Sequence, residues 1–159
     1  MHLTLTPHES LTVVEHSADR LVVDVTYAPG GSAPPTHYHP AQDERFEVRS
    51  GVVGVKLGEE ERELRAGDVL EIPRGTKHAM WNAGDEPATA VWTTSPAGRT
   101  LDWFRNLDAI PGKPGAVSLA PALLAYDDVF RLAGPRWLIR PLLRVLTVFS
   151  RREVLVAAT

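Results

Sequence analysis

Four side chains that can bind a metal ion stand in two short stretches of the sequence. In "HYHPAQDE", residues 37–44, two histidines are separated by one residue and Glu44 closes the stretch. A third histidine, His78, stands in the later stretch "PRGTKHAMWN". Neutral imidazoles and a carboxylate are suitable ligands for a divalent first-row transition metal. The sequence therefore raises the question whether His37, His39, Glu44 and His78 meet at one ion.

The residues around this set alternate as the residues of β-strands do. Successive side chains of a strand point to opposite faces, so His37 and His39 should project to one side, and Glu44 should share a face with Phe46. We expect that face to be the core face, where a carboxylate without a partner is costly. A divalent cation would satisfy the carboxylate and both imidazoles together. Periodicity alone does not place His78 beside the other three.

The chain divides into two zones with different periodicities. Up to about residue 96, short alternating segments end in turn residues about every eight to twelve positions, which is typical of a β-sandwich or a small barrel. Beyond that point the apolar spacing becomes helical, and residues 122–134 and 135–155 are both predicted to be helical. We therefore expect a mainly β domain over residues 1–97 and a helical extension over residues 98–159.

Ten positions of the first zone fit two spaced motifs, with fifteen residues between the end of the first motif and the start of the second. They are Gly31, His37, His39, Glu44 and Gly51, followed by Gly67, Pro73, Gly75, His78 and Asn82. On these residues the chain resembles the cupin superfamily, in particular small single-domain microbial cupins of type 2 that are similar to quercetin dioxygenase. The resemblance covers about residues 10–96.

The resemblance implies a fold and a metal site. The fold is a single antiparallel β-barrel with jelly-roll topology, here followed by C-terminal α-helices. The site is one divalent metal ion inside the barrel, bound by His37, His39, Glu44 and His78. The glycines of the motifs are then turn formers, and Asn82 ties backbone at the end of a strand. Iron, manganese, nickel, cobalt and zinc all suit this donor set, so the sequence does not identify the metal.

Two further roles follow for residues near the predicted site. We expect Glu44 to relay a proton as well as to bind the metal. Tyr27, Phe46, Met80 and Trp92 are predicted to wall a pocket for a small organic molecule, with plain barrel core as the alternative. The leading functional hypothesis is a metal-dependent, dioxygenase-like oxidoreductase. The alternatives are a non-catalytic cupin that binds or senses a small molecule and, less favoured, a metal-dependent isomerase.

Composition and charge restrict the classes of partner and the location. The chain has 159 residues, a formal net charge of −3 and no cysteine, which excludes thiolate metal sites and cysteine nucleophiles. Residues 1–128 carry a balance of −8, so no nucleic-acid partner is expected. The start "MHLTLTPHES" lacks the pattern of a signal peptide, and the longest apolar stretch is interrupted by arginine and proline. We expect a cytoplasmic protein.

The C-terminal zone is basic, with a balance of +5 over residues 129–159. Arg136, Arg140 and Arg144 recur every four residues beside apolar positions, in one helix bent at Pro141 or in two shorter helices. Such a stripe docks on the acidic barrel of its own chain or of a second subunit, or it lies on an anionic membrane. The charge asymmetry makes docking the simpler account. The resemblance adds that such extensions can cap a barrel mouth and that the assembly is a homodimer.

Overall fold

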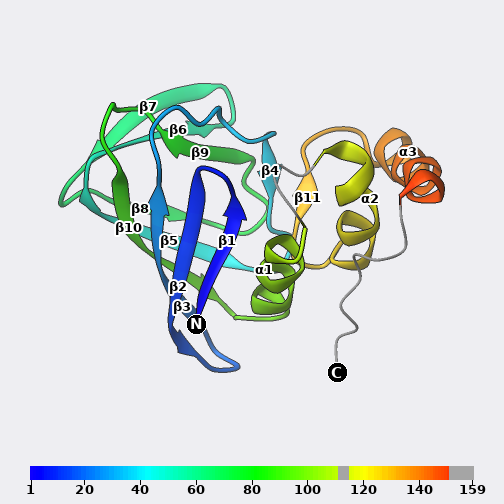
Figure 1. Cartoon of the computed structure of the whole chain (residues 1–159), viewed down its shortest axis with the longest axis horizontal. Helices are drawn as coiled ribbons and strands as arrows, with labels where there is room; N and C mark the ends of the chain where they lie inside the picture. The colour runs from blue at the N-terminus through cyan, green and yellow to red at the C-terminus, as the bar shows by residue number, and fades with distance from the viewer. Residues whose placement is uncertain (111–114, 151–159) are drawn as a thin grey trace.

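The computed structural model describes residues 1–110 and 115–150, in which two antiparallel sheets enclose one core (Figure 1). One sheet has the strand order β1-β2-β3-β10-β5-β8, and the other has the order β11-β4-β9-β6-β7. The strands are β1 His2–Thr6, β2 Glu9–His16, β3 Leu21–Tyr27, β4 His37–Tyr38, β5 Asp43–Ser50, β6 Val52–Leu57, β7 Glu60–Arg65, β8 Val69–Ile72, β9 His78–Asn82, β10 Ala88–Ser95 and β11 Arg131–Leu132. The expected mainly β jelly-roll barrel with C-terminal helices is confirmed.

The alternation read from the sequence sets which side chains are buried. In β3, Leu21, Val23, Val25 and Tyr27 are buried, and the residues between them are less so. In β5, Glu44, Phe46 and Val48 are buried in the same alternating manner. Apolar burial on this scale is the main favourable contribution to folding. Burial of this face of β5 also brings the carboxylate of Glu44 into the core, because Glu44 shares the face with two apolar residues.

Helices follow the barrel in the order α1 Thr100–Asp108, α2 Ala116–Ala125 and α3 Arg136–Phe149. Helix α1 packs against β1, and its Asp108 accepts a hydrogen bond from the Thr4 amide at 2.7 Å. Helix α2 lies between the barrel and α3, which packs on α2 (Figure 1). Over the described residues, no helix combines the length and the apolar character needed to cross a membrane.

The prediction of a helix over residues 122–134 was wrong beyond residue 125. Helix α2 ends there, and the chain turns into β11, which pairs with β4 through Arg131↔Tyr38 and Leu132↔His37. Arg131 also bonds the carbonyl oxygen of Asp127 through Nε at 2.7 Å, which stabilises the turn. Because β11 pairs with the exposed edge of β4, its backbone N–H and C=O groups find hydrogen-bond partners without forming a helix. The last predicted helix forms as one element that contains Pro141, and residues 151–155 of that prediction lie outside the described residues.

Candidate metal centre

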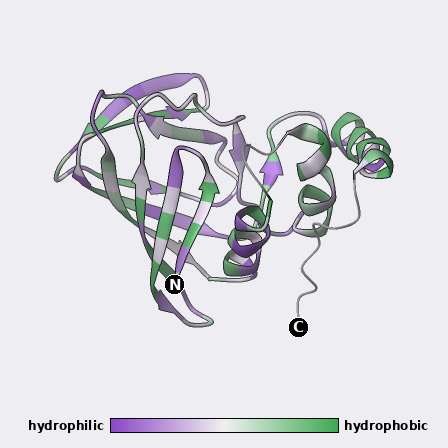
Figure 2. Cartoon of the chain, viewed as in Figure 1, coloured by the Kyte–Doolittle hydropathy of each residue, from purple (hydrophilic) through white to green (hydrophobic). Residues whose placement is uncertain are grey.

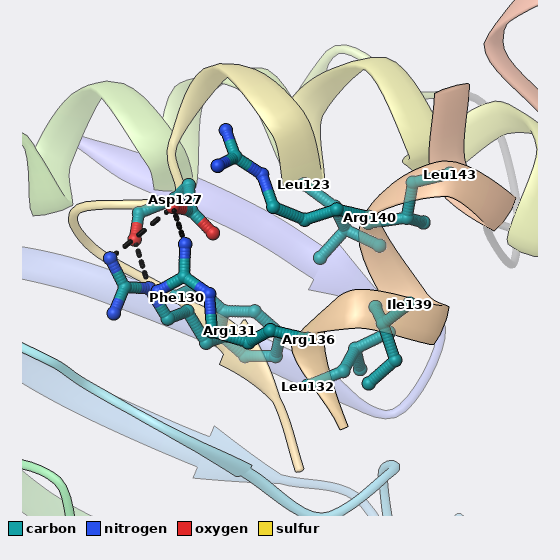
Figure 3. Close-up of a pocket in the computed structure, with 9 residues that line it drawn as sticks. All are labelled: Leu123, Asp127, Phe130, Arg131, Leu132, Arg136, Ile139, Arg140 and Leu143. Carbon is teal, nitrogen blue, oxygen red and sulfur yellow. Dashed lines mark hydrogen bonds and ion pairs between the residues drawn. The ribbon is translucent and has the colours of Figure 1, made fainter. Parts of the chain in front are cut away.

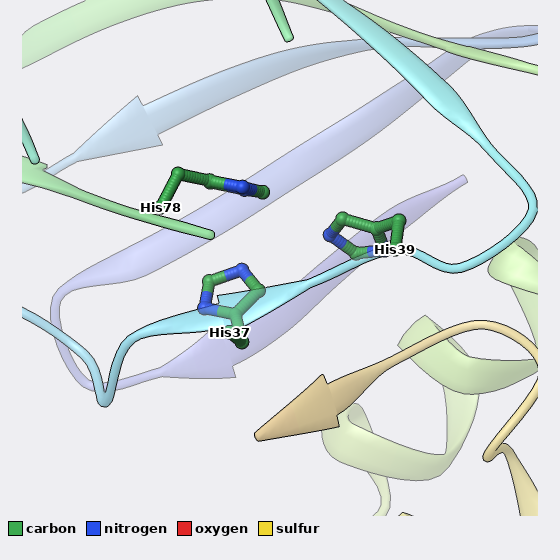
Figure 4. Close-up of side chains that lie close together, drawn as sticks. All are labelled: His37, His39 and His78. Atoms are coloured by element: carbon green, nitrogen blue, oxygen red, sulfur yellow. The ribbon is translucent and has the colours of Figure 1, made fainter. Parts of the chain in front are cut away.

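The three motif histidines lie close together (Figure 4). His37 and His39 come from β4 and the residue that follows it, and His78 begins β9, which pairs with β4 in the register His37↔His78. One ring nitrogen from each of the three lies within 4.8 Å of the others. Strand pairing thus supplies the contact with His78 that periodicity alone could not provide.

Each imidazole is oriented by a backbone carbonyl at its Nδ1 atom. His37 Nδ1 lies 3.0 Å from the Pro35 oxygen, His39 Nδ1 lies 2.7 Å from the Val129 oxygen, and His78 Nδ1 lies 3.0 Å from the Thr76 oxygen. A carbonyl oxygen only accepts, so Nδ1 must be the protonated nitrogen in all three rings. In a neutral ring Nε2 then carries a free lone pair. This is the tautomer, fixed by a second hydrogen bond, that metal-binding histidines adopt.

Glu44 lies between two of these rings. Its Oε1 is 3.3 Å from His39 Nε2, and its Oε2 is 3.1 Å from His78 Nε2. Despite these distances, His39 Nε2 and Glu44 Oε2 are buried with no aligned hydrogen-bond partner among the described residues. Buried polar atoms rarely lack a partner, so the side chains are oriented toward a common point more than toward one another. A divalent cation at that point fits the donor set of three imidazoles and one carboxylate.

The electrostatics of the site favour neutral rings at two of the three histidines. Burial lowers the pKa of His37 well below its usual value, and the nearby His78 and His39 lower it further. Burial also lowers the pKa of His39, although the Glu44 carboxylate opposes this effect. At His78 burial acts in the same direction, but the adjoining Glu44 carboxylate outweighs it and the pKa is raised. His37 and His39 are therefore held in the form that binds a metal.

The C-terminal extension contributes directly to this centre, which the sequence did not reveal. Besides the Val129 carbonyl on His39, Phe130 stacks on His37 with ring centroids 4.4 Å apart and an interplanar angle of 20°. Trp103 of α1 stacks on Phe130 at 5.0 Å. A main-chain carbonyl has no side-chain signature in a sequence. Phe130 was hidden because its segment was predicted to continue a helix.

The segment that carries Val129 and Phe130 is anchored on both sides. Tyr126 accepts a hydrogen bond from Asn106 Nδ2 of α1 at 2.7 Å, and Arg99 forms an ion pair with Asp128. Phe130 also lines a small pocket between α2, β11 and α3, where Asp127 pairs with Arg131 and Arg136 (Figure 3). Contacts to α1, α2 and α3 therefore hold the covering residues over the histidines.

The four residues predicted to wall a pocket are all buried in the core, and contact with a ligand remains a prediction for each. They are Tyr27, Phe46, Met80 and Trp92. Trp92 donates a hydrogen bond from Nε1 to Glu44 Oε1 at 3.0 Å. Phe46 stacks on the indole of Trp92 with centroids 5.2 Å apart. Trp92 is thus a partner of Glu44, a role that the sequence did not indicate because the two residues lie on different strands.

The sequence reasoning also missed a second acidic residue that lies close to the core, Glu9 of β2. Glu9 begins β2 and lies opposite Tyr27 in the β2–β3 register. Burial raises the pKa of Glu9 from 4.5 to about 7. Burial also raises the pKa of Tyr27 well above its usual value, and the charges of Glu9 and Glu44 raise it further. The signal in the sequence was the alternation of β2, in which Glu9 has the same parity as the buried Leu11.

Two other motif residues hold the strands that carry the candidate ligands. Asn82, at the end of β9, donates hydrogen bonds from Nδ2 to the carbonyl oxygens of Tyr27 and Glu86 and accepts one from the Gly84 amide. Its predicted role of tying backbone at a strand end is confirmed. Gly75 adopts a φ of 82°, which only glycine reaches without strain, and its amide donates to the His39 carbonyl at 2.8 Å.

Comparison with known proteins agrees with this geometry. The family model described as "Cupin domain" matches residues 23–94. A probable oxidoreductase of Hypocrea virens is 30% identical over 120 residues, which cover 68% of this chain and 55% of that protein. An oxidoreductase of Pestalotiopsis fici is 49% identical over 65 residues, which cover 40% of this chain and 32% of that protein. The chain thus spans about half or less of the length of these relatives.

A solved structure shares the fold. KdgF from Halomonas sp. superimposes with a TM-score of 0.58 at 24% identity, covering 64% of this chain and 92% of that one. The matched family segment contains β4, β5 and β9, which carry His37, Glu44 and His78, and it also contains His39, the residue that follows β4. Residues 23–94 therefore form a cupin domain.

Proposed function

We propose that this cupin binds one divalent transition metal through His37, His39, Glu44 and His78 and oxidises a small organic molecule beside it. The observation that carries the proposal is the common orientation of the imidazoles, each with Nδ1 on a carbonyl and Nε2 left as a ligand. Similarity to two proteins named as oxidoreductases supports the class of reaction. Iron, manganese, nickel, cobalt and zinc all accept this donor set.

A bound transition metal would supply a position where a substrate oxygen meets dioxygen or water. The residues of the chain supply orientation and proton transfer. Trp92 holds Oε1 of Glu44, and Oε2 accepts no hydrogen bond among the described residues, so Oε2 is left to bind the metal. Proton transfer from a substrate hydroxyl to Glu44 is a further part of the proposal. Tyr27, Phe46 and Met80 belong to the apolar wall that would exclude water.

The second candidate is a cupin that binds or senses a small molecule without turnover, and it needs the same metal site. A sugar or keto-acid isomerase is less favoured. The fully buried imidazole and carboxylate side chains in the described part of the chain are His39, Glu44 and His78, which the proposed metal site uses, and Glu9 is only half-buried. Few groups remain there to bind a highly polar substrate. A homodimeric assembly and a cytoplasmic location remain part of the proposal.

Metal analysis tests the site, and oxygen consumption tests the reaction. Untagged protein purified without chelator should contain about one transition metal per chain, and the His78→Ala variant should lose it. The matched control is His16→Ala, which removes an exposed histidine of β2. Full occupancy in His78→Ala would show that the proposed site is wrong. Oxygen uptake by iron-loaded protein with phenols or diketones would support the oxidoreductase, and tight binding without uptake would favour the sensor.

A further inference from the structure

Helix α3 exposes most of its apolar side chains to solvent. Of the ten large hydrophobic residues that are exposed in the described part of the chain, six lie on this one helix. They are Trp137, Leu138, Leu142, Val145, Val148 and Phe149. Trp137 is 79% exposed and Phe149 is 71% exposed, and in Figure 2 the helix is largely coloured as hydrophobic. Contiguous exposed apolar surface of this kind marks an interaction site.

The packing of α3 explains why this face is free. Only Leu143 is buried in α3, and Ile139 and Leu146 are partly buried against the core cluster. These three positions form a narrow stripe that packs on α2 and β11, as Figure 3 shows for Ile139 and Leu143. The sequence favoured docking of this helix on an acidic barrel. Within the chain, α2 lies between α3 and the barrel, so docking on its own barrel does not cover the exposed face.

The exposed apolar face is bordered by positive charge. Arg136, Arg140 and Arg144 lie one turn apart on the same side of the helix, and α3 contains no acidic residue. Arg136 pairs with Asp127 at 2.9 Å. Across residues 1–110 and 115–150, no carboxylate lies within ion-pair distance of Arg140 or Arg144. Two cations therefore stand at the edge of an apolar face that includes a tryptophan and a phenylalanine.

A lipid surface fits this face better than a second copy of the chain does. Fourteen residues at about 1.5 Å each give a helix about 21 Å long and about 10 Å wide, so its face covers on the order of 200 Å². A stable protein partner usually buries roughly 800 Å² on each side. The four other exposed hydrophobic residues in the described part of the chain are scattered over β2, β8, α2 and the N-terminus, so they offer no matching patch.

We propose that α3 binds the surface of an anionic lipid bilayer. Trp137 and Phe149, near opposite ends of the helix, enter the interface with the aliphatic residues between them, while Arg140 and Arg144 contact lipid phosphates. A short helix that is basic on one side and rich in Trp, Phe and Leu on another binds membranes in this manner. The barrel and its metal centre remain on the aqueous side. The proposal is independent of the reaction that the metal centre performs.

Vesicle sedimentation with the full chain tests this proposal. The probe is phosphatidylcholine vesicles containing about one third phosphatidylserine, compared with pure phosphatidylcholine, at about 0.1 M salt. Wild type should bind the anionic vesicles. Replacing Arg140 and Arg144 with Gln should weaken binding roughly fivefold per arginine, about 25-fold for the pair. The matched control, Arg62→Gln with Arg65→Gln on β7, removes the same charge from the barrel and should bind as wild type does.

The contribution of the apolar side chains to vesicle binding is tested separately. Trp137→Ala with Phe149→Ala should abolish binding while leaving the thermal transition unchanged, because both side chains are exposed. Trp137 should also give a vesicle-induced blue shift in fluorescence that Trp137→Phe removes. No binding to anionic vesicles, or equal binding by the Gln pair and the β7 control, would overturn the proposal. So would a concentration-dependent dimer that the Ala pair dissociates, since a second copy would then cover the face.

Discussion

The indole nitrogen of Trp92 donates a hydrogen bond to Glu44 Oε1 at 3.0 Å, and both side chains are buried. The two residues face each other because β10 pairs with β5 in the register Trp92↔Phe46 and Thr94↔Glu44. Phe46 and Phe104 pack against the indole with centroid distances of 5.2 Å and 5.0 Å, so the ring has little freedom to turn. The hydrogen bond therefore fixes one oxygen of Glu44 and leaves the other available for the proposed metal ion.

Replacing Trp92 with Phe should weaken metal binding without removing a ligand. The phenyl ring retains much of the apolar packing, but it cannot donate to Glu44. Loss of such a supporting hydrogen bond typically reduces metal affinity about tenfold or more. Titration against a competing chelator measures the change, and Trp81→Phe on β9, a partly exposed position, is the control. Equal affinity in the two variants would mean that Trp92 does not orient Glu44.

Phe130→Ala tests whether the extension orders the metal centre. Truncation removes the ring that stacks on His37 and Trp103, and it should lower the free energy of unfolding by about 2 to 3 kcal/mol. It should also weaken metal binding, because His37 loses the surface that orients its ring. Phe130→Leu, which retains most of the volume, should recover most of the stability.

The control for Phe130 is the same substitution elsewhere in the extension. Phe149 is 71% exposed, so Phe149→Ala should change stability by less than about 0.5 kcal/mol and leave metal affinity unaltered. Denaturant titration and metal titration on the same samples separate the two effects. Wild-type metal affinity in Phe130→Ala would show that the barrel alone orders the site.

Metal should stabilise the fold, since the ligands meet only in the folded chain. At a free metal concentration of about one hundred times Kd, binding adds about 2.7 kcal/mol to the free energy of unfolding. For a domain of this size that corresponds to an increase in Tm of roughly 5 to 10 °C. Melting curves of metal-free protein with and without added metal measure the shift. It should disappear in His39→Ala and persist in His16→Ala, and a shift that survived in His39→Ala would place the binding elsewhere.

Some of this centre could be predicted from the sequence because it depends on local alternation. The parity of β5 placed Glu44 and Phe46 on the same core face, and the spacing of His37 and His39 predicted that both project to the same side of the chain. The assignment of Asn82 to a strand end came instead from the resemblance to cupins. The conclusions on Glu44, His37 and His39 required only the period of a strand and the identities of nearby residues.

The remaining features depend on contacts between distant parts of the chain. Trp92 meets Glu44 because β10 inserts between β3 and β5, an order that no local pattern specifies. Val129 acts through its carbonyl oxygen, so its side chain gave no indication. Phe130 reaches His37 because the chain leaves α2 early and β11 pairs with β4, although its apolar spacing was that of a helix. Tertiary pairing thus overrode a weak local preference.

Glu9 predicts a dependence of stability on pH. Its pKa is about 7 in the folded protein against an ordinary value of 4.5, so the folded chain binds this proton more tightly than the unfolded chain does. The resulting stabilisation is fully present below about pH 4.5 and is lost as the pH rises through 7. Glu9→Gln carries no such charge. It should therefore match wild type near pH 4 and be more stable at pH 8, by on the order of 2 kcal/mol for a half-buried group.

Urea titrations of metal-free protein between pH 4 and pH 8 measure this difference, and Glu15→Gln on the same strand is the control. Glu15 accepts hydrogen bonds from Arg20, and that contact lowers its pKa. The ionised Glu15 side chain therefore contributes to the free energy of unfolding at high pH, and this contribution is lost on acidification. For this reason Glu15→Gln should not be more stable than wild type at pH 8. If the free energy of unfolding had the same pH dependence in wild type and in Glu9→Gln, the prediction would be wrong. Glu9 would then ionise in the folded barrel as easily as in the unfolded chain.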